Sequence, residues 1–66
     1  MADLTEIEQQ VLDYVVDCKT NIQIAEEIGY SEAQVKRIIK RLFKRTKTSC
    51  RLELVKFYII SQFEQK

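Results

Sequence analysis

Proline is absent from this sequence, and glycine occurs once, at Gly29. The apolar-polar alternation typical of strands is also rare, while 45% of the 66 residues are hydrophobic. This balance suits a compact bundle of short helices and not a sheet or a disordered tail. We therefore predict a single all-α domain, because the chain is too short for a second one.

Histidine is also absent, and cysteine occurs only at Cys18 and Cys50. Two cysteines are too few for a disulfide scaffold and, without a histidine or a third cysteine, for a zinc site. We expect buried or half-buried thiols there, with a redox role left open. The sequence also lacks a glycine-rich phosphate loop, paired acids on a plausible cleft, and enough chain to exclude water from a site. These absences predict a protein that is not an enzyme and uses no metal ion or cofactor.

Long apolar runs are missing as well. No run approaches the roughly 18 residues that cross a bilayer, and residues 1–6 lack the cationic start of a signal peptide. We expect a cytoplasmic protein without a membrane partner. A core built from so few residues is marginally stable without help, which dimerisation would supply.

Acidic residues are missing from positions 33–52. Residues 1–32 carry eight acids and one base, a net charge of −7, whereas residues 33–51 carry eight bases and no acid, a net charge of +8. The overall charge of +1 thus hides a strongly dipolar molecule, and its local field decides what it attracts. Either the acidic half neutralises the basic half within the fold, or the basic segment meets a polyanionic partner.

The basic charge is concentrated in the segment from Ser31 to Arg45, SEAQVKRIIKRLFKR. At about 100° per residue, this segment forms a helix with two unlike sides. Its apolar arc consists of Val35, Ile38, Ile39, Leu42 and Thr46. Its basic side consists of Ala33, Lys36, Arg37, Lys40, Arg41 and Lys44, with Gln34 at the border. Cations four residues apart repel by about 0.2–0.5 kcal/mol per pair, and a polyanion would offset that repulsion.

Three capping boxes mark where the first three helices begin. They pair Thr5 with Glu8, Thr20 with Gln23, and Ser31 with Gln34. Gly29 ends the second helix, and Ser49 or Thr48 caps a fourth. The pattern predicts helices over about residues 5–18, 21–28, 32–46 and 50–62. The second and third, joined by a short turn with glycine, follow the helix-turn-helix pattern.

The last predicted helix has too many apolar residues for one core-facing stripe. Part of that surface needs a second partner, and in a small chain the simplest one is the same helix of another copy, in a two-fold contact. The residues that we expect to be exposed for this contact are Phe57, Ile60 and Phe63. The alternative is a helix that lies deep in a groove of its own monomer and is buried nearly all round.

Four segments in order carry a family resemblance: LTEIEQQVL at 4–12, NIQIAEEIGYSE at 21–32, VK at 35–36 and SCRLELV at 49–55. With them the chain, roughly from Leu4 to Ile60, closely resembles the LuxR/GerE-type DNA-binding domain. The resemblance implies a bacterial transcription regulator with four helices and no wing, whose third helix enters the major groove and whose fourth supports a dimer. The chain looks like the stand-alone, GerE-like kind.

Two departures from the family pattern accompany this resemblance. Thr46-Lys47-Thr48 stands where those proteins usually have Leu-Gly-Val, which leaves the end of the third helix open. Ile38 stands where a histidine is common, so one polar contact near the DNA backbone is in question.

The resemblance and the basic helix together predict sequence-specific binding of double-stranded DNA by a homodimer. Gln34 can hydrogen-bond adenine, Arg37 can fork onto guanine, and Ala33 can touch a thymine methyl group. Bases or phosphates are the expected partners of Lys36, Lys40 and Arg41. Phosphates are the expected partners of Thr20, Asn21, Lys44, Arg45, Lys47 and Arg51.

Other functions stay open at this point. A protein-interaction module could pair through its fourth helix with a longer LuxR-type regulator and hold that regulator off DNA. Such a regulator, or RNA polymerase, is therefore a further candidate partner. Region 4 of a sigma factor shares the Thr-Glu opening and the basic helix, but a long apolar fourth helix is not expected there.

Overall fold

The computed structural model describes residues 4–64. It consists of four α-helices, which are α1 (Glu6–Val16), α2 (Asn21–Ile28), α3 (Glu32–Thr46) and α4 (Arg51–Glu64). There is no strand within the described residues. The predicted all-α, four-helix architecture is therefore confirmed, and each predicted boundary lies within two residues of the observed one.

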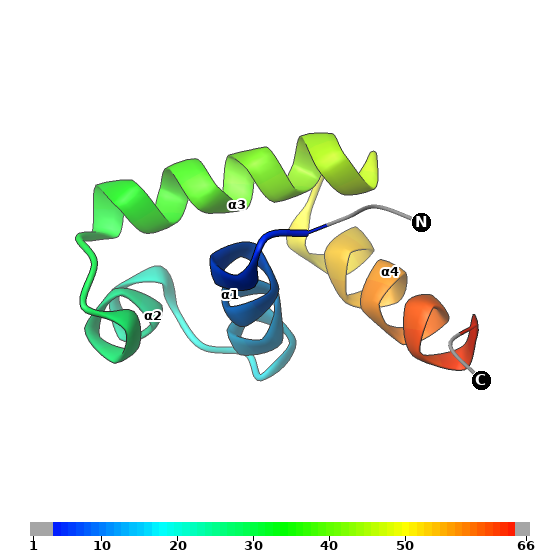
Figure 1. Ribbon diagram of the computed structural model, residues 1–66, viewed down its shortest axis with the longest axis horizontal. Coiled ribbons are helices and arrows are strands. Elements are labelled where there is room, and N and C mark those ends of the chain that lie inside the picture. Colours follow the sequence, from blue (N-terminus) through cyan, green and yellow to red (C-terminus); the bar gives the residue numbers. More distant parts are fainter. Residues whose placement is uncertain (1–3, 65–66) are drawn as a thin grey trace.

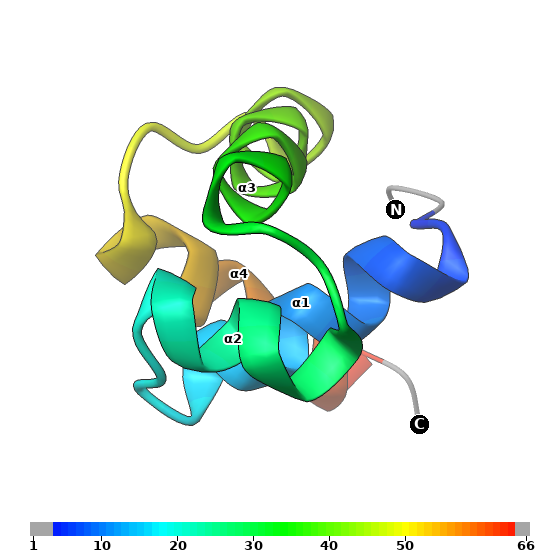
Figure 2. The same cartoon turned by 90° about the vertical axis from the view of Figure 1, so that its left-hand side faces the viewer.

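The longest helix, α3, lies along one side of the molecule (Figure 1). Figure 2 shows α3 nearly end-on, with α1, α2 and α4 all below it. α3 packs on α2 and α1, and α4 packs on α1 and α3. This arrangement leaves the outer side of α3 uncovered by the other helices.

The core lies where α1, α2 and α3 converge. Its buried apolar members are Val11, Leu12, Val15, Ile24, Ala25, Val35, Ile38, Ile39, Leu42 and Leu54. Burying one Val, Leu or Ile side chain contributes about 1.5–3 kcal/mol. α4 adds only Leu54 to this set, with Phe57 and Tyr58 packed against it from the edge. α4 therefore joins the core through one fully buried side chain and two partly buried aromatic rings.

The first three helices begin as predicted, each with a complete capping box. In each box the cap hydroxyl accepts from the N–H three residues later, and the side chain at that later position accepts from the N–H of the cap residue. The pairs are Thr5 with Glu8, Thr20 with Gln23, and Ser31 with Gln34. Each cap stabilises its helix by about 1 kcal/mol. Because the cap residue and its partner lie only three positions apart in the sequence, these starts were predicted within one residue.

Two helices end at residues in the left-handed conformation, Gly29 after α2 with φ +74° and Lys47 after α3 with φ +56°. Lys47 takes this conformation where the resembling family usually has glycine, so α3 ends at Thr46 and does not run on. Thr46 supports this end, because its buried hydroxyl donates to the Leu42 carbonyl oxygen at 2.7 Å and lies 2.9 Å from the Thr48 hydroxyl.

Both cysteines are exposed, so the prediction of buried or half-buried thiols is wrong. α1 ends at Val16, and Cys18 then turns to φ +65°, which takes its side chain off the apolar stripe that contains Val11 and Val15. Cys50 lies in the connection just before α4, where no helix covers it.

The start of α4 also differs from the predicted cap. Ser49 donates its backbone N–H at 2.6 Å and its hydroxyl at 3.0 Å to one carboxylate oxygen of Glu53. The serine therefore acts as a donor, whereas a helix cap would accept. The backbone bond first, and then the hydroxyl bond, hold the pKa of Glu53 below its ordinary value because they favour the charged carboxylate.

Candidate nucleic-acid interface

The outer face of α3 carries the predicted basic side, and all of its members are exposed. They are Ala33, Lys36, Arg37, Lys40, Arg41 and Lys44. The face points outward because the apolar arc of the same helix is buried, including Thr46 at 9% exposure. Lys44 and Arg45 lie in the last turn, where the helix dipole favours positive charge.

The cations on this face differ in their partners. Lys36 Nζ lies 3.9 Å from Glu32 one turn earlier, an exposed pair of the kind that contributes little. Within residues 4–64, Arg37, Lys40 and Lys44 make no ion pair or hydrogen bond. These three residues, the central cations, have no counter-charge from the described part of the chain.

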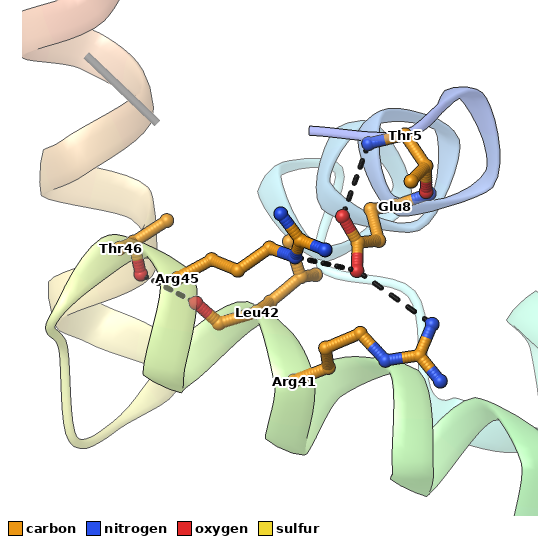
Figure 3. A network of polar contacts seen from close by, with 6 residues as sticks. All are labelled: Thr5, Glu8, Arg41, Leu42, Arg45 and Thr46. Carbon is orange, nitrogen blue, oxygen red and sulfur yellow. Dashed lines mark hydrogen bonds and ion pairs between the residues drawn. The ribbon is translucent and has the colours of Figure 1, made fainter. Parts of the chain in front are cut away.

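The α1 edge of the face is organised by Glu8, whose side chain is fully buried. Its Oε1 accepts from the Thr5 N–H at 3.0 Å, while its Oε2 lies 3.1 Å from Arg45 Nε and 3.7 Å from Arg41 Nη1. Figure 3 shows both guanidinium groups turned from α3 toward this carboxylate. Among the described residues no donor meets Oε2 with hydrogen-bond geometry, so ion pairs balance its charge.

The opposite edge of the face is organised by Arg51, the first residue of α4. Its Nη1 donates to Asn21 Oδ1 at 3.0 Å and its Nη2 to the Lys19 carbonyl oxygen at 2.8 Å. The structure thus brings together two predicted phosphate contacts, Asn21 and Arg51, and uses them to join α4 to the turn before α2. A hollow beside this edge is lined by Asn21, Lys36, Arg37, Ile39, Lys40, Phe43 and Arg51.

Three further predicted contact residues lie near helix ends. Thr20 and Lys47 are exposed, at the N-cap of α2 and the C-cap of α3. Gln34 is exposed too, but its Oε1 accepts from the Ser31 N–H at 2.9 Å. One of the two polar atoms that would pair with adenine is therefore engaged in the helix cap.

α4 presents an apolar strip to solvent that differs from the predicted set. Ile60 and Phe63 are 54% and 70% exposed as expected, whereas Phe57 is half-buried against the core. Leu52 and Ile59 join the exposed set at 71% and 47%. At about 100° per residue Phe57 lies beside the buried Leu54, which explains the correction. The outer strip of α4 thus consists of Leu52, Ile59, Ile60 and Phe63.

Sequence reasoning missed two contacts that shape this surface. It identified Glu8 only as a capping residue, and it treated Asn21 and Arg51 as separate phosphate contacts. Both contacts join segments far apart in the chain, so no local spacing of residues predicts them. The one available signal was an acid at Glu8 where the other two capping boxes have glutamine.

The described residues hold no group of three or more side chains suited to a metal ion. No helix among them is long and apolar enough to cross a membrane. Hollows along α3 are open, and one is lined by Arg37, Lys40, Arg41 and Lys44. Such a surface suits an extended anionic partner that lies against a helix.

Comparison with known proteins identifies relatives over most of the chain. The chain is 42% identical over 55 residues to the response regulator Rre1 of Synechocystis sp. and 44% identical over 55 residues to the probable transcriptional regulator ycf29 of Cyanophora paradoxa. Each match covers 83% of this chain but only 24% and 26% of the relatives. The chain therefore spans about a quarter of their length. No solved structure matches it.

The match to a protein family is more extensive. Residues 2–58 match the family described as bacterial regulatory proteins, luxR family. The matched range includes all of α1, α2 and α3 and the first part of α4, which is the part that forms the core and the basic face. This chain therefore belongs to the luxR family of bacterial regulatory proteins.

Proposed function

We propose that the chain binds double-stranded DNA as part of a transcription regulator, with the outer face of α3 in the major groove. The observation that carries the proposal is the row of central cations on an uncovered helix face, with no counter-charge from the described residues. The major groove, about 12 Å wide, admits an α-helix. The family and the names of the two relatives support the same function.

In this proposal the first half of α3 reads base edges. Arg37 forks onto guanine O6 and N7, and Ala33 meets a thymine methyl group. Gln34 keeps its Oε1 in the helix cap and donates from its Nε2 to adenine N7. Lys36 and Lys40, one and two turns into the helix, serve bases or phosphates.

Contacts to phosphates would hold the domain in register without reading sequence. Lys44 and Lys47 lie at the end of α3, beyond the base-reading residues. The other phosphate contacts lie on the two edges of the face and are Thr20, Asn21, Arg41, Arg45 and Arg51. The exposure of Lys44 and Lys47 supports this assignment.

The outer strip of α4 supports a homodimer in this proposal. Two copies that pair through Leu52, Ile59, Ile60 and Phe63 would form an isologous contact. Such a dimer would place two α3 helices in successive major grooves, about 34 Å apart, on a palindromic site. The same strip favours the second candidate function, in which the chain pairs with a longer family member and blocks its DNA binding.

Selection of bound sequences from random DNA at two salt concentrations tests the primary function. Enrichment of one near-palindromic sequence, with binding that weakens as salt rises, is the expected result. Binding that ignores salt would argue against nucleic acid, and enrichment of no sequence would remove the specific role. Heterodimers with a longer family member, in a chain that has no DNA affinity of its own, would favour the second candidate.

Two alanine variants separate the assigned roles on the selected site. Arg37→Ala is expected to cost roughly 1–3 kcal/mol and to relax the preference at one base position, whereas Lys44→Ala weakens all sequences alike and flattens the salt slope by about 1. Equal effects of both variants on specific and random DNA would contradict these roles.

The dimer is tested by sedimentation of the chain and of Phe63→Ser, which places a polar group on a side chain that is 70% exposed. The variant is expected to be monomeric at concentrations where the parent chain is dimeric, with its helix content unchanged. A parent chain that stays monomeric both alone and on a palindromic duplex would refute the homodimer.

A further inference from the structure

Glu8 differs from the residues that occupy the same place in the other two capping boxes. Gln23 and Gln34 close their boxes with a neutral side chain that accepts from the cap N–H at 2.9 Å. Glu8 closes its box with the same bond at 3.0 Å and adds a negative charge. Glutamine thus suffices for this cap elsewhere in the chain, and the charge of Glu8 needs another explanation.

The charge of Glu8 faces two arginines of α3. Its side chain is 0% exposed, while those of Arg41 and Arg45 are 54% and 43% exposed. A buried carboxylate has no water to solvate it and therefore holds nearby cations firmly. Figure 3 shows both arginine side chains extended from α3 to the start of α1, where they meet Oε2 of Glu8.

This pairing changes what the basic face offers to a polyanion. Glu8, Arg41 and Arg45 together have a net charge of +1, whereas the two arginines alone would contribute +2. The guanidinium groups are also fixed at the α1 edge of the face. The central cations have no such compensation within residues 4–64.

We infer that Glu8 is a positioning residue that limits binding to DNA of random sequence by holding Arg41 and Arg45 at the edge of the recognition face. The inference rests on the proposed function and extends it to a residue outside α3. Non-specific binding is almost entirely electrostatic. Because Arg41 and Arg45 are assigned to phosphates, Glu8 lowers the electrostatic part of the affinity for specific and random DNA alike, and sequence preference stays with Ala33 and Arg37.

The test compares Glu8→Gln with Glu6→Gln. Glutamine retains the capping bond of Glu8 and removes its charge, and Glu6 is an exposed acid in the same first turn that gives the same change in net charge. Glu8→Gln is expected to bind a random duplex about fivefold to tenfold more tightly at 0.1 M salt, with a salt slope steeper by about 1, because one more phosphate is neutralised. Affinity for the selected site rises by a similar factor, and Glu6→Gln changes both affinities little.

A second comparison leaves Glu8 intact and serves if Glu8→Gln does not fold. Arg41→Gln and Lys44→Gln each remove one charge from an exposed position on the same face of α3. Glu8 holds Arg41 at the edge of the face, whereas Lys44 makes no ion pair within residues 4–64, so Arg41→Gln is expected to lower the logarithm of random-duplex affinity by less than Lys44→Gln does. Arg45 continues to pair with Glu8 in both variants.

Either comparison can overturn the inference. Random-duplex affinity that is unchanged or weaker in a folded Glu8→Gln variant contradicts it, as do equal losses from Arg41→Gln and Lys44→Gln. Failure of the proposed function gives a different result. In that case the DNA selection enriches no sequence, but Glu8→Gln still elutes from heparin at higher salt than Glu6→Gln. If heparin elution is the same for these two variants, the role of Glu8 is wrong whatever the DNA selection gives.

Discussion

Lys47 provides a sharp test of how α3 ends, because its backbone and its charge can be changed separately. It follows the last residue of α3 with φ +56° and ψ +42°, in the left-handed region that L-residues with a side chain avoid. Lys47→Gly relieves this conformation and removes the charge. Lys47→Ala removes the charge and keeps the conformational cost, so it is the matched control.

The expected gain in stability of Lys47→Gly over Lys47→Ala follows from two opposing contributions. A left-handed residue with a Cβ costs about 1–2 kcal/mol relative to glycine. Glycine offsets about 0.4–1 kcal/mol of this gain in stability, because it adds conformational freedom to the unfolded chain. Lys47→Gly is therefore expected to be more stable than Lys47→Ala by about 0.5–1 kcal/mol. For a domain of this size the difference raises Tm by about 3–6 °C.

Thermal unfolding followed by circular dichroism measures the difference in stability, and DNA titration at several salt concentrations measures the loss of the charge. Both variants are expected to bind DNA with the same reduced salt slope, since both lack the ammonium group. Equal Tm values for the two variants would refute the assignment of left-handed strain at this position. Different salt slopes would show that the backbone at Lys47 also positions other DNA contacts.

Three further predictions concern stability. Leu54→Ala is expected to cost about 2–5 kcal/mol, enough to unfold much of a domain this small, whereas Leu52→Ala changes the unfolding free energy of the monomer little, because these side chains are 0% and 71% exposed; equal costs in chemical denaturation at concentrations where the chain is monomeric would contradict the fold of α4. Glu53→Gln is expected to be less stable than the parent chain at neutral pH, since the bonds from Ser49 need the carboxylate. This difference in stability should vanish as the pH falls below the ordinary glutamate value of 4.5 and through the lowered pKa of Glu53. A difference in stability that persists at low pH in an acid titration would rule this out. Gly29→Ala is expected to cost about 1 kcal/mol at φ +74°, a purely conformational cost because no neighbour lies within 4 Å of the added Cβ, and Gly29→Asn should cost less in the same unfolding assay.

The helix starts could be predicted from the sequence because local hydrogen bonds set them. A capping box spans four residues, so Thr5, Thr20 and Ser31 each identify a start without knowledge of the rest of the fold. The faces of α3 were predicted for a similar reason, since its apolar and basic residues alternate with the period of a single helix. The end of α3 was less certain, because Lys47 adopts a conformation that its residue type disfavours.

The contacts between helices were harder to predict than the helices themselves. Phe57 was assigned to an exposed set because α4 is apolar on more than one side, and only the packing of Leu54 on the core decides which side faces in. Cys18 was expected to be buried or half-buried, but α1 ends two residues before it. The pairing of Glu8 with Arg41 and Arg45 depends on the angle at which α1 meets α3, which no local pattern specifies.

The structure also bears on the explanation of the charge asymmetry in which the acidic half neutralises the basic half. Among the described acids of the first half of the chain, only Glu8 and Glu32 pair with bases of the second half. Other acids on α1 and α2, such as Asp13, Glu26 and Glu27, are exposed on helices that lie on the inner side of α3 (Figure 2). The molecule measures 33 × 20 × 19 Å, whereas salt screens exposed charges over about 8 Å at physiological ionic strength. The acidic half therefore leaves the positive potential of the central cations largely intact. A polyanion that approaches along the outer face of α3 is attracted by these cations and lies too far from most of the acids to be repelled by them.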